Sequence, residues 1–530
     1  MVGPKPAVAP VSEAADARED HHHASGTRSV ARGGFANLVG AGYAGIASFV
    51  ITALVARMAT TQDAGIYFSS ISILLIAVAL VELGTPVGFV YFLARLRGLE
   101  QTGRMRAILT AGAVPMIAIG SVVAVVGILA REPLGELLLG PEVDPSATIM
   151  VVLALTLLVA ITADSVLGAT RGLGVMRPTV VTDRFVNPTV QLAALLLLAA
   201  AGWTASEELI LTRTAGFLAV VVLALPWLLR LLRRYPAPAG TTFRETWIPD
   251  AELLGRFWRF TGPRALGQFA QVGIQRVDIV LVALWLSPAE AAVYAVATRF
   301  LVFGQLAANA IGTAVQPRIS TLAARGERAA LQHLYRTSTA WVMFATWPIY
   351  LVFIVHAERL MRLFGEEYAS GALVLQVLSA AMLVATACGA VDAVLLMAGK
   401  STWTMMNAWG ALVLNVALNI WLIPLLGILG AAIAWAGAIV ANNLVPLLQV
   451  RLGLGVHPFG RTTLSAALIP VVLFGGIPWM VDAMGGGPLG ALISATFAVA
   501  IYSALVWKWR HSLGVDGLLS RRARNRPSTP

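Results

Sequence analysis

The segment AGIYFSSISILLIAVALVELG, residues 64–84, decides what kind of fold this chain adopts. It contains no charged residue between Ile66 and Val81. Similar apolar runs of about 20 residues recur from Phe35 to Trp509, and a helix of that length crosses the ~30 Å hydrocarbon core of a bilayer. An open sheet is excluded, because its edges would leave backbone groups unpaired in lipid. We therefore predict an all-α, polytopic membrane protein.

The composition of the whole chain supports the same prediction. Of 530 residues, 58% are hydrophobic and 12% are charged, whereas a soluble domain carries about 25% charged residues. A soluble protein of this size needs a wetted surface, so the bilayer must be the solvent for most of this chain.

The apolar runs predict fourteen membrane spans, of which the thirteenth is interrupted by Gly475, Gly476 and Pro478. The spans cover residues 34–57, 66–93, 107–130, 147–171, 178–201, 209–232, 260–286, 290–316, 334–356, 370–398, 402–423, 428–451, 461–482 and 488–509.

The distribution of basic residues predicts the orientation of these spans. Arginines follow the even-numbered spans, as in residues 95–106 after the second and 230–259 after the sixth. The loops that follow odd-numbered spans contain few Lys and Arg residues and are often acidic, as at Glu207 and Glu208. The positive-inside rule then places both termini in the cytoplasm.

The two halves of the chain also resemble each other. Ala64-Gly65-Ile66-Tyr67 recurs as Ala291-Ala292-Val293-Tyr294, and Leu83-Gly84-Thr85 recurs as Ile311-Gly312-Thr313, a shift of about 228 residues. Each repeat contains six spans, an even number, so both halves should share one orientation and be related by an axis along the membrane normal.

This repeat divides the chain into predicted units. They are a disordered cytoplasmic tail (1–33), an N-lobe of spans 1–6 (34–232), a cytoplasmic inter-lobe loop (233–259), a C-lobe of spans 7–12 (260–452), two extra spans (453–510) and a basic cytoplasmic tail (511–530).

Several classes of function are disfavoured by the sequence. The single cysteine, Cys388, excludes an intramolecular disulfide and a cysteine metal cluster. Gly399-Lys400-Ser401 lacks the upstream glycine of a phosphate-binding loop, since Val394 stands there. No nucleophile elbow or metalloprotease motif occurs. The net charge of +11 comes from loops, where topology explains it without nucleic acid. We expect no enzyme activity, cofactor, metal site or nucleic-acid partner.

Several motifs, taken in order, resemble those of the polysaccharide flippases. They are Ala56-Arg57, Ala64-Gly65-Ile66-Tyr67, Leu83-Gly84, Ala94-Arg95, Leu363-Phe364-Gly365 with Tyr368, and Pro424 with Gly427-Ile428-Leu429-Gly430-Ala431-Ala432-Ile433-Ala434. The similarity covers roughly residues 35–455. This family belongs to the multidrug/oligosaccharidyl-lipid/polysaccharide exporter superfamily. Fourteen spans look like the lipid II flippase branch, whereas the motifs look more like the O-antigen and exopolysaccharide branch.

The resemblance implies two six-helix lobes around a central cavity that opens alternately to either side. It also implies a flippase for undecaprenyl-pyrophosphate-linked oligosaccharides, in the bacterial cytoplasmic membrane, for cell-surface polysaccharide synthesis. A monomer is expected, in contact with membrane lipids, the lipid-linked saccharide and, as candidate partners, a polysaccharide polymerase and glycosyltransferases.

Two other functions compete with this one. A cation-coupled multidrug exporter of the same superfamily would prefer a cavity with buried carboxylates. A membrane scaffold or glycosyltransferase is a third alternative, and such an enzyme should place paired acidic residues in a sizeable loop.

Charges near the middle of the bilayer are the strongest candidates for a substrate site, because they are costly there. Arg276 and Asp278 lie in span seven and Arg299 in span eight, and the two arginines are equally distant from the turn between these spans. One aspartate cannot neutralise two arginines, and guanidinium groups bind phosphate oxygens in a bidentate fork. We therefore predict a pyrophosphate site. The alternative is an Asp278–Arg299 ion pair that pins the two helices, with Arg276 snorkelling outward.

A polar stripe extends the predicted site along span seven. Gln268, Gln271 and Gln275 recur at spacings of three and four and should share one face near Arg264. Such a face either lines the substrate cavity or forms hydrogen bonds between helices.

Four carboxylates near the predicted cytoplasmic ends of spans are candidates for proton or cation coupling. They are Glu82, Asp164, Asp183 and Asp392.

Overall fold

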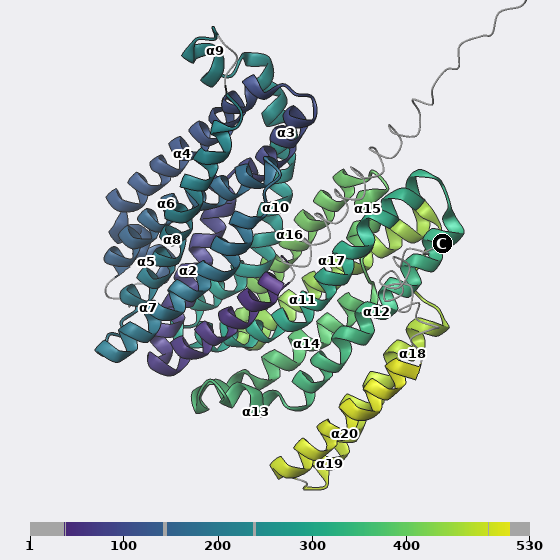
Figure 1. Cartoon of the computed structure of the whole chain (residues 1–530). Helices are drawn as coiled ribbons and strands as arrows, with labels where there is room; N and C mark the ends of the chain where they lie inside the picture. The colour runs from purple at the N-terminus through teal and green to yellow at the C-terminus, as the bar shows by residue number, and fades with distance from the viewer. Residues whose placement is uncertain (1–36, 38, 141–145, 237–239, 486, 509–530) are drawn as a thin grey trace, which may run out of the picture.

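The computed structural model of the chain describes residues 37, 39–140, 146–236, 240–485 and 487–508 (Figure 1). Every regular element in this part of the chain is a helix, and none of these residues forms a strand. The predicted all-α class is therefore confirmed. The predicted tails at 1–33 and, from residue 511, at the C-terminus lie outside the described residues.

Twelve helices among the described residues are long and apolar enough to cross a membrane. They are Val39–Met58, α2 (Thr61–Val81), Thr102–Leu129 with α4 (Met105–Leu129), Ala147–Gly172 in α6 (Ser146–Gly172), Thr179–Ala201 with α7 (Asn187–Ala201), α8 (Ser206–Arg233), α11 (Pro288–Ala324), α12 (Arg328–Val355), Glu366–Ala387 with α14 (Ala372–Ala387), α16 (Ser401–Leu426), α17 (Ile428–Leu454) and Arg461–Val481, which includes α18 (Arg461–Pro470).

Two of the predicted spans do not meet these criteria, so the number fourteen is not confirmed. The predicted seventh span lies in α10 (Ala251–Trp285), whose 35 residues make it about 52 Å long. Its polar stripe lowers its hydropathy, and α10 packs against α2, α3 (Thr85–Gly98) and α16. The predicted fourteenth span lies in α20 (Gly487–Lys508), where only Ile493–Lys508 counts as an apolar helix and is too short.

Short helices complete the described fold. The α-helices among them are α5 (Arg131–Leu139), α9 (Phe243–Trp247), α13 (Ala357–Arg362), α15 (Val391–Met397) and α19 (Ile477–Ala483). Thr102–Arg104 and Glu366–Gly371 are 3-10 helices, and Thr179–Val186 and Val471–Gly476 are π-helices. In the loop before α10, the backbone amide and hydroxyl of Thr242 donate to Glu245 at the start of α9 and lower the pKa of that carboxyl.

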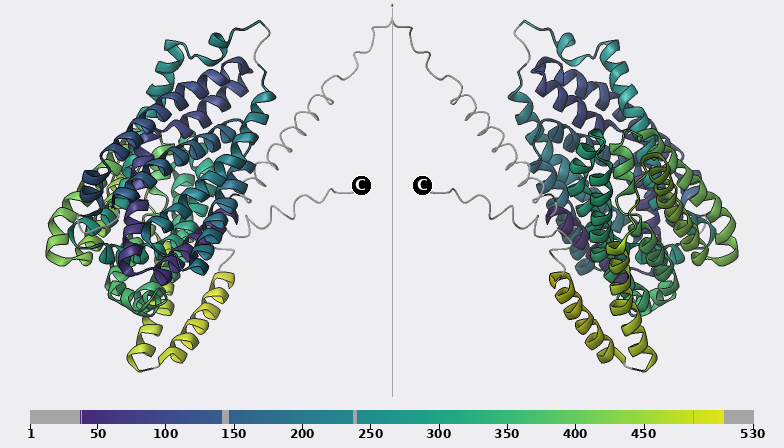
Figure 2. Two further views of the ribbon diagram at one scale, coloured as in Figure 1. Left: turned by 90° about the vertical axis from the view of Figure 1, so that its left-hand side faces the viewer. Right: turned by 90° about the vertical axis from the view of Figure 1, so that its right-hand side faces the viewer.

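The helices form two groups, with α10 beside α16 at the boundary. Figure 1 shows α4 to α8 on one side and α12 to α17 on the other. Helix α2 lies at the boundary, where it packs against both α10 and α11. Figure 2 shows α18 to α20 projecting beyond the rest of the bundle, and they attach to it through α12.

The first turns of α2 and α11 meet in backbone contact. An ideal Cβ at Gly65 would lie 1.7 Å from the carbonyl oxygen of Pro288, so only glycine fits. Both helices start with side-chain caps, since Thr60 accepts from the amide of Asp63 and Ser287 from the amide of Glu290. We call this contact between the helix starts the α2–α11 seam.

Helix α2 does not continue to the end of the predicted span 66–93. It ends at Val81, and Leu83 and Gly84 take positive φ values of 50° and 71° before α3 begins. Leu83 is unusual, because residues with a Cβ rarely adopt this conformation. The matching segment of the second half, Ile311-Gly312, lies inside the continuous helix α11.

Candidate functional site

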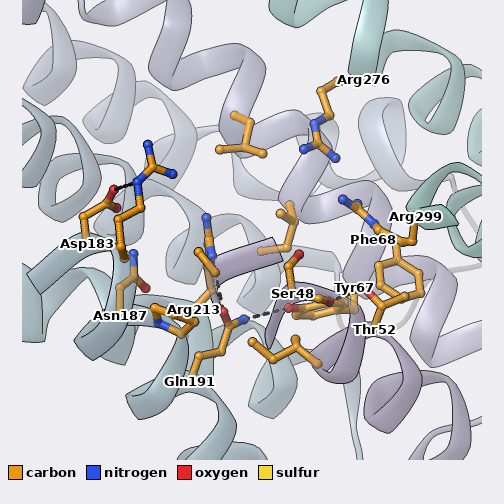
Figure 3. Close-up of a pocket in the computed structure, with 16 residues that line it drawn as sticks. Ser48, Thr52, Tyr67, Phe68, Asp183, Asn187, Gln191, Arg213, Arg276 and Arg299 are labelled. Carbon is orange, nitrogen blue, oxygen red and sulfur yellow. Dashed lines mark hydrogen bonds and ion pairs between the residues drawn. The ribbon is translucent and has the colours of Figure 1, made fainter. Parts of the chain in front are cut away.

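A cavity of about 230 Å³ lies where the two groups of helices meet (Figure 3). Its charged and polar lining comes from the first helix, α2, the π-helix Thr179–Val186 before α7, α7, α8, α10 and α11. These side chains are Ser48, Thr52, Tyr67, Asp183, Arg184, Asn187, Gln191, Arg213, Arg276 and Arg299. We call it the arginine cavity.

Arg276 on α10 and Arg299 on α11 both line this cavity, as their equal distance from the intervening turn suggests. Neither has a carboxylate within 4 Å among the described residues. The Nε atom of Arg299 is buried and makes no hydrogen bond there. In Figure 3 the two guanidinium groups point toward the same open space.

The cavity carries a strong positive charge. Asp183 lies 3.5 Å from Arg184 and offsets one arginine. Four arginines against one aspartate leave three positive charges. Three uncompensated guanidinium groups facing one space in a low-dielectric environment favour a multivalent anion such as a pyrophosphate.

Arg213 on α8 is a third arginine of the cavity without a carboxylate within 4 Å among the described residues, and the sequence analysis missed it. Its guanidinium lies 4.6 Å from the centre of the Phe217 ring and donates to the Oε1 atom of Gln191 at 3.2 Å. The Nε2 atom of Gln191 donates to the hydroxyl of Tyr67 at 2.9 Å. Gln191 is 2% exposed, so this chain of bonds fixes Arg213 from within the protein (Figure 3). The signal was available, since Arg213 is a charge inside the predicted sixth span.

Asp278 lies outside the arginine cavity. Its carboxylate accepts a hydrogen bond from the hydroxyl of Tyr294 at 3.1 Å and another from the Nδ2 atom of Asn419 at 2.7 Å. Asn419 also donates to the side chain of Asn415. The predicted alternative of an Asp278–Arg299 ion pair is therefore wrong. The amide of Asn419 on α16 supplies the partner, because α16 packs against α10.

The polar stripe of α10 divides between two other cavities. Arg264, Gln268 and Gln271 line a cavity of about 410 Å³ between α10 and α16. Arg264 does not point freely into it, since its guanidinium stacks 3.7 Å above the Phe260 ring and donates to the Phe260 carbonyl.

Gln271 and Gln275 line a further cavity of about 380 Å³, on the side of α10 and α11 that faces α14, α15 and α17. Its polar lining is Gln271, Gln275, Gln305, Asn309, Thr313, Gln316, Thr386, Asp392 and Asn443. We call it the amide cavity. The sequence analysis did not identify Gln305, Asn309 and Gln316, although their spacings of four and seven on one helix are a recognisable signal.

The four carboxylates predicted for ion coupling do not form one site. Glu82 is buried beside Asp164, and its Oε1 atom makes no hydrogen bond within the described residues. Asp183 lies against Arg184 in the arginine cavity, and Asp392 lines the amide cavity. No group of three or more His, Cys, Asp or Glu that could hold a metal occurs among the residues searched.

Comparisons with protein families and with known proteins show which proteins this chain resembles. The sequence model of a family described as "Polysaccharide biosynthesis protein" matches residues 30–323, and that of the MatE family matches residues 263–421. A probable low-salt glycan biosynthesis flippase, Agl15 of Haloferax volcanii, is 22% identical over 283 residues, which are 51% of this chain and 55% of that protein. The chain thus spans about half the length of this relative.

Solved structures share the fold at low sequence identity. The lipid II flippase MurJ in an inward closed conformation has a TM-score of 0.69 at 13% identity, covering 89% of this chain and 98% of that one. An inward-facing multidrug resistance transporter of the MATE family has a TM-score of 0.65 at 14% identity, covering 78% and 94%. The resemblance predicted from the motifs is confirmed. The first family model covers more than half of the 530 residues, so the chain is a multi-pass membrane protein that belongs to the polysaccharide biosynthesis protein family.

Proposed function

We propose that this protein is a flippase that moves a lipid-linked saccharide across the membrane, with its pyrophosphate held in the arginine cavity. The observation that carries the proposal is that Arg213, Arg276 and Arg299 face one cavity without a carboxylate partner among the described residues. The Haloferax relative is named as a glycan flippase, which supports the substrate class.

In this mechanism the protein moves its substrate and makes or breaks no covalent bond in it. The charged head group would enter the arginine cavity while the polyprenyl tail stays in lipid. Guanidinium groups would replace the water around the pyrophosphate, which lowers the cost of bringing that charge to the membrane centre. Movement of one group of helices against the other would then expose the cavity to the opposite side. We propose that the two lobes that move are bounded at residues 232–233 and 259–260, and that the loop between these positions connects them.

The proposal also covers location and partners. The chain would act in a bacterial cytoplasmic membrane with both termini in the cytoplasm, and it would receive substrate from glycosyltransferases and deliver it to a polysaccharide polymerase.

The decisive experiment measures translocation of a fluorescent undecaprenyl-pyrophosphate-linked sugar in proteoliposomes. Arg276→Ala and Arg299→Ala should each abolish translocation while the protein still inserts and unfolds at its usual temperature. Lysine at either position should restore part of the activity, because it keeps the charge but loses the bidentate fork. Arg256→Ala is the matched control, since Arg256 lies on α10 but pairs with Glu252 outside the cavity. Normal translocation by both alanine variants would refute the pyrophosphate site.

Export of cationic drugs is the second candidate, and the match to the MatE family favours it. The same proteoliposomes distinguish the two functions when they are loaded with ethidium. A drug exporter should transport ethidium and should not translocate the lipid-linked sugar. We expect the reverse, because three uncompensated arginines repel a cation.

A further inference from the structure

We infer that the amide cavity is a second subsite, which binds the hydroxyl groups of the saccharide while the arginine cavity holds the pyrophosphate. This inference rests on the proposed function and adds to it a separate place for the sugar. The amide cavity is about 380 Å³, within the size range of natural ligand pockets.

The side chains of this cavity are of the type that sugar hydroxyls require. Gln271 and Gln275 project from α10, and Gln305, Asn309 and Gln316 project from α11. Each amide offers two N–H donors and a carbonyl acceptor without a net charge. A sugar hydroxyl both donates and accepts, so an amide matches it in either role.

These five amides are available for a ligand. None of their side chains makes a hydrogen bond within the described part of the chain. Some other amides in the bundle do have partners within the protein: Asn407 and Gln449 bond to each other at 2.8 and 2.9 Å, and Gln376 donates to a backbone carbonyl. Gln275 and Asn309 are exposed and the other three amides are half-buried, so their polar atoms are open to the cavity and can bind a polar ligand there.

The charges of the two cavities favour the pyrophosphate in the arginine cavity and the saccharide in the amide cavity. Among the described residues, Asp392 is the only ionisable one that lines the amide cavity, whereas the arginine cavity has three excess positive charges. A pyrophosphate is therefore attracted to the arginine cavity and repelled by Asp392. The carboxylate of Asp392 is in turn a strong acceptor for hydroxyl groups.

The same two helices carry both subsites in a matched order. On α10 the amides at 271 and 275 precede Arg276, and on α11 those at 305, 309 and 316 follow Arg299. The helices run in opposite directions from the turn at Ser287, so on each of them the amides lie farther from this turn than the arginine. Gln275 and Arg276 are consecutive, and their side chains point about 100° apart, one toward each cavity.

The test compares two probes on the full chain in lipid nanodiscs: undecaprenyl pyrophosphate, and the same lipid carrying N-acetylglucosamine. The variants are Gln271→Met, Gln305→Met and their combination, which keep side-chain length but remove the amide. The matched control is Gln62→Met, an exposed amide on α2. Dissociation constants and thermal unfolding are measured for each protein, and the single variants keep the comparison intact if the double variant does not fold.

Wild-type protein should bind the glycosylated probe more tightly than the bare one. Each glutamine variant should weaken binding of the glycosylated probe about two- to tenfold, the usual effect of one lost hydrogen bond, and leave the bare probe unchanged. Equal affinity of the wild type for both probes, or equal weakening of both by the glutamine variants, would overturn the sugar subsite. Failure of the proposed function gives a different result, because the bare probe would then not bind the wild type or would bind Arg276→Ala equally well.

Discussion

Replacing Gly65 by alanine tests whether the α2–α11 seam is as tight as the structure indicates. The new Cβ would lie 1.7 Å from the carbonyl oxygen of Pro288, whereas ordinary contact begins at 3.4 Å. The two helix starts must therefore separate by about 1.7 Å. A backbone carbonyl cannot rotate away as a side chain does, so the whole helix start has to move.

We expect this substitution to lower the free energy of unfolding by about 1–3 kcal/mol, the usual cost of overpacking. Alanine favours helix over glycine by up to about 1 kcal/mol, which offsets part of that loss. Gly410→Ala on α16 is the matched control, because its Cβ meets no atom within 4 Å and only the gain in helix propensity remains.

Two assays measure the effect. Thermal unfolding of the purified protein should show Gly65→Ala less stable than wild type and Gly410→Ala equal or more stable. A reporter Ala291→Cys, in a background with Cys388→Ala, should react faster with a water-soluble maleimide in the Gly65→Ala protein, since Ala291 is fully buried beside the seam. If Gly65→Ala matched the control in stability and left the reporter unreactive, the close backbone contact would not exist in the protein.

The remaining predictions concern orientation, Arg213 and Asp278. Tags in the 233–259 loop and at the C-terminus should be accessible only from the cytoplasm, as the arginine distribution requires, and labelling of either from outside would reverse the orientation. Gln191→Leu should lower the affinity for undecaprenyl pyrophosphate, because Arg213 loses the acceptor that positions it, and Gln191→Glu should lower it as well, because the new carboxylate compensates the charge of Arg213; an unchanged affinity in Gln191→Leu would remove the positioning role. Asp278→Ala should destabilise the fold by about 1–3 kcal/mol, since it leaves the buried hydroxyl of Tyr294 without its acceptor and removes one acceptor of the Asn419 amide, while binding of the bare pyrophosphate lipid stays within twofold; a selective loss of binding would bring Asp278 into the site.

The sequence predicted the class of fold because lipid imposes a simple rule on the chain. Apolar runs of sufficient length must be helices, and most predicted spans coincide with helices that meet the criteria for crossing. The rule fails at Glu82–Gly84, because the predicted span continues through these residues whereas helix α2 ends before them. It also fails for α10, whose glutamines at 268, 271 and 275 line cavities between helices.

The candidate site was only partly predictable, for a similar reason. Arg276 and Arg299 lie on consecutive helices joined by a short turn, so counting residues from Ser287 suggests that they face one cavity. The partner of Asp278 is 141 residues away at Asn419, and no local spacing indicates that contact. Arg213 reaches the cavity from α8 through Gln191 on α7, an arrangement that depends on tertiary packing.

The break between α2 and α3 gives the two halves different mechanical properties. Helix α11 is continuous over 37 residues, and its internal proline, Pro317, lies in its last third, so a tilt of its first turn would be transmitted along the 29 residues before that proline. In the first half the helix is interrupted, because α2 ends at Val81 and Leu83-Gly84 adopt positive φ values before α3, so a tilt of α2 would not be transmitted directly to α3. If the halves rock against each other, the second half should transmit the movement and the first half should absorb it.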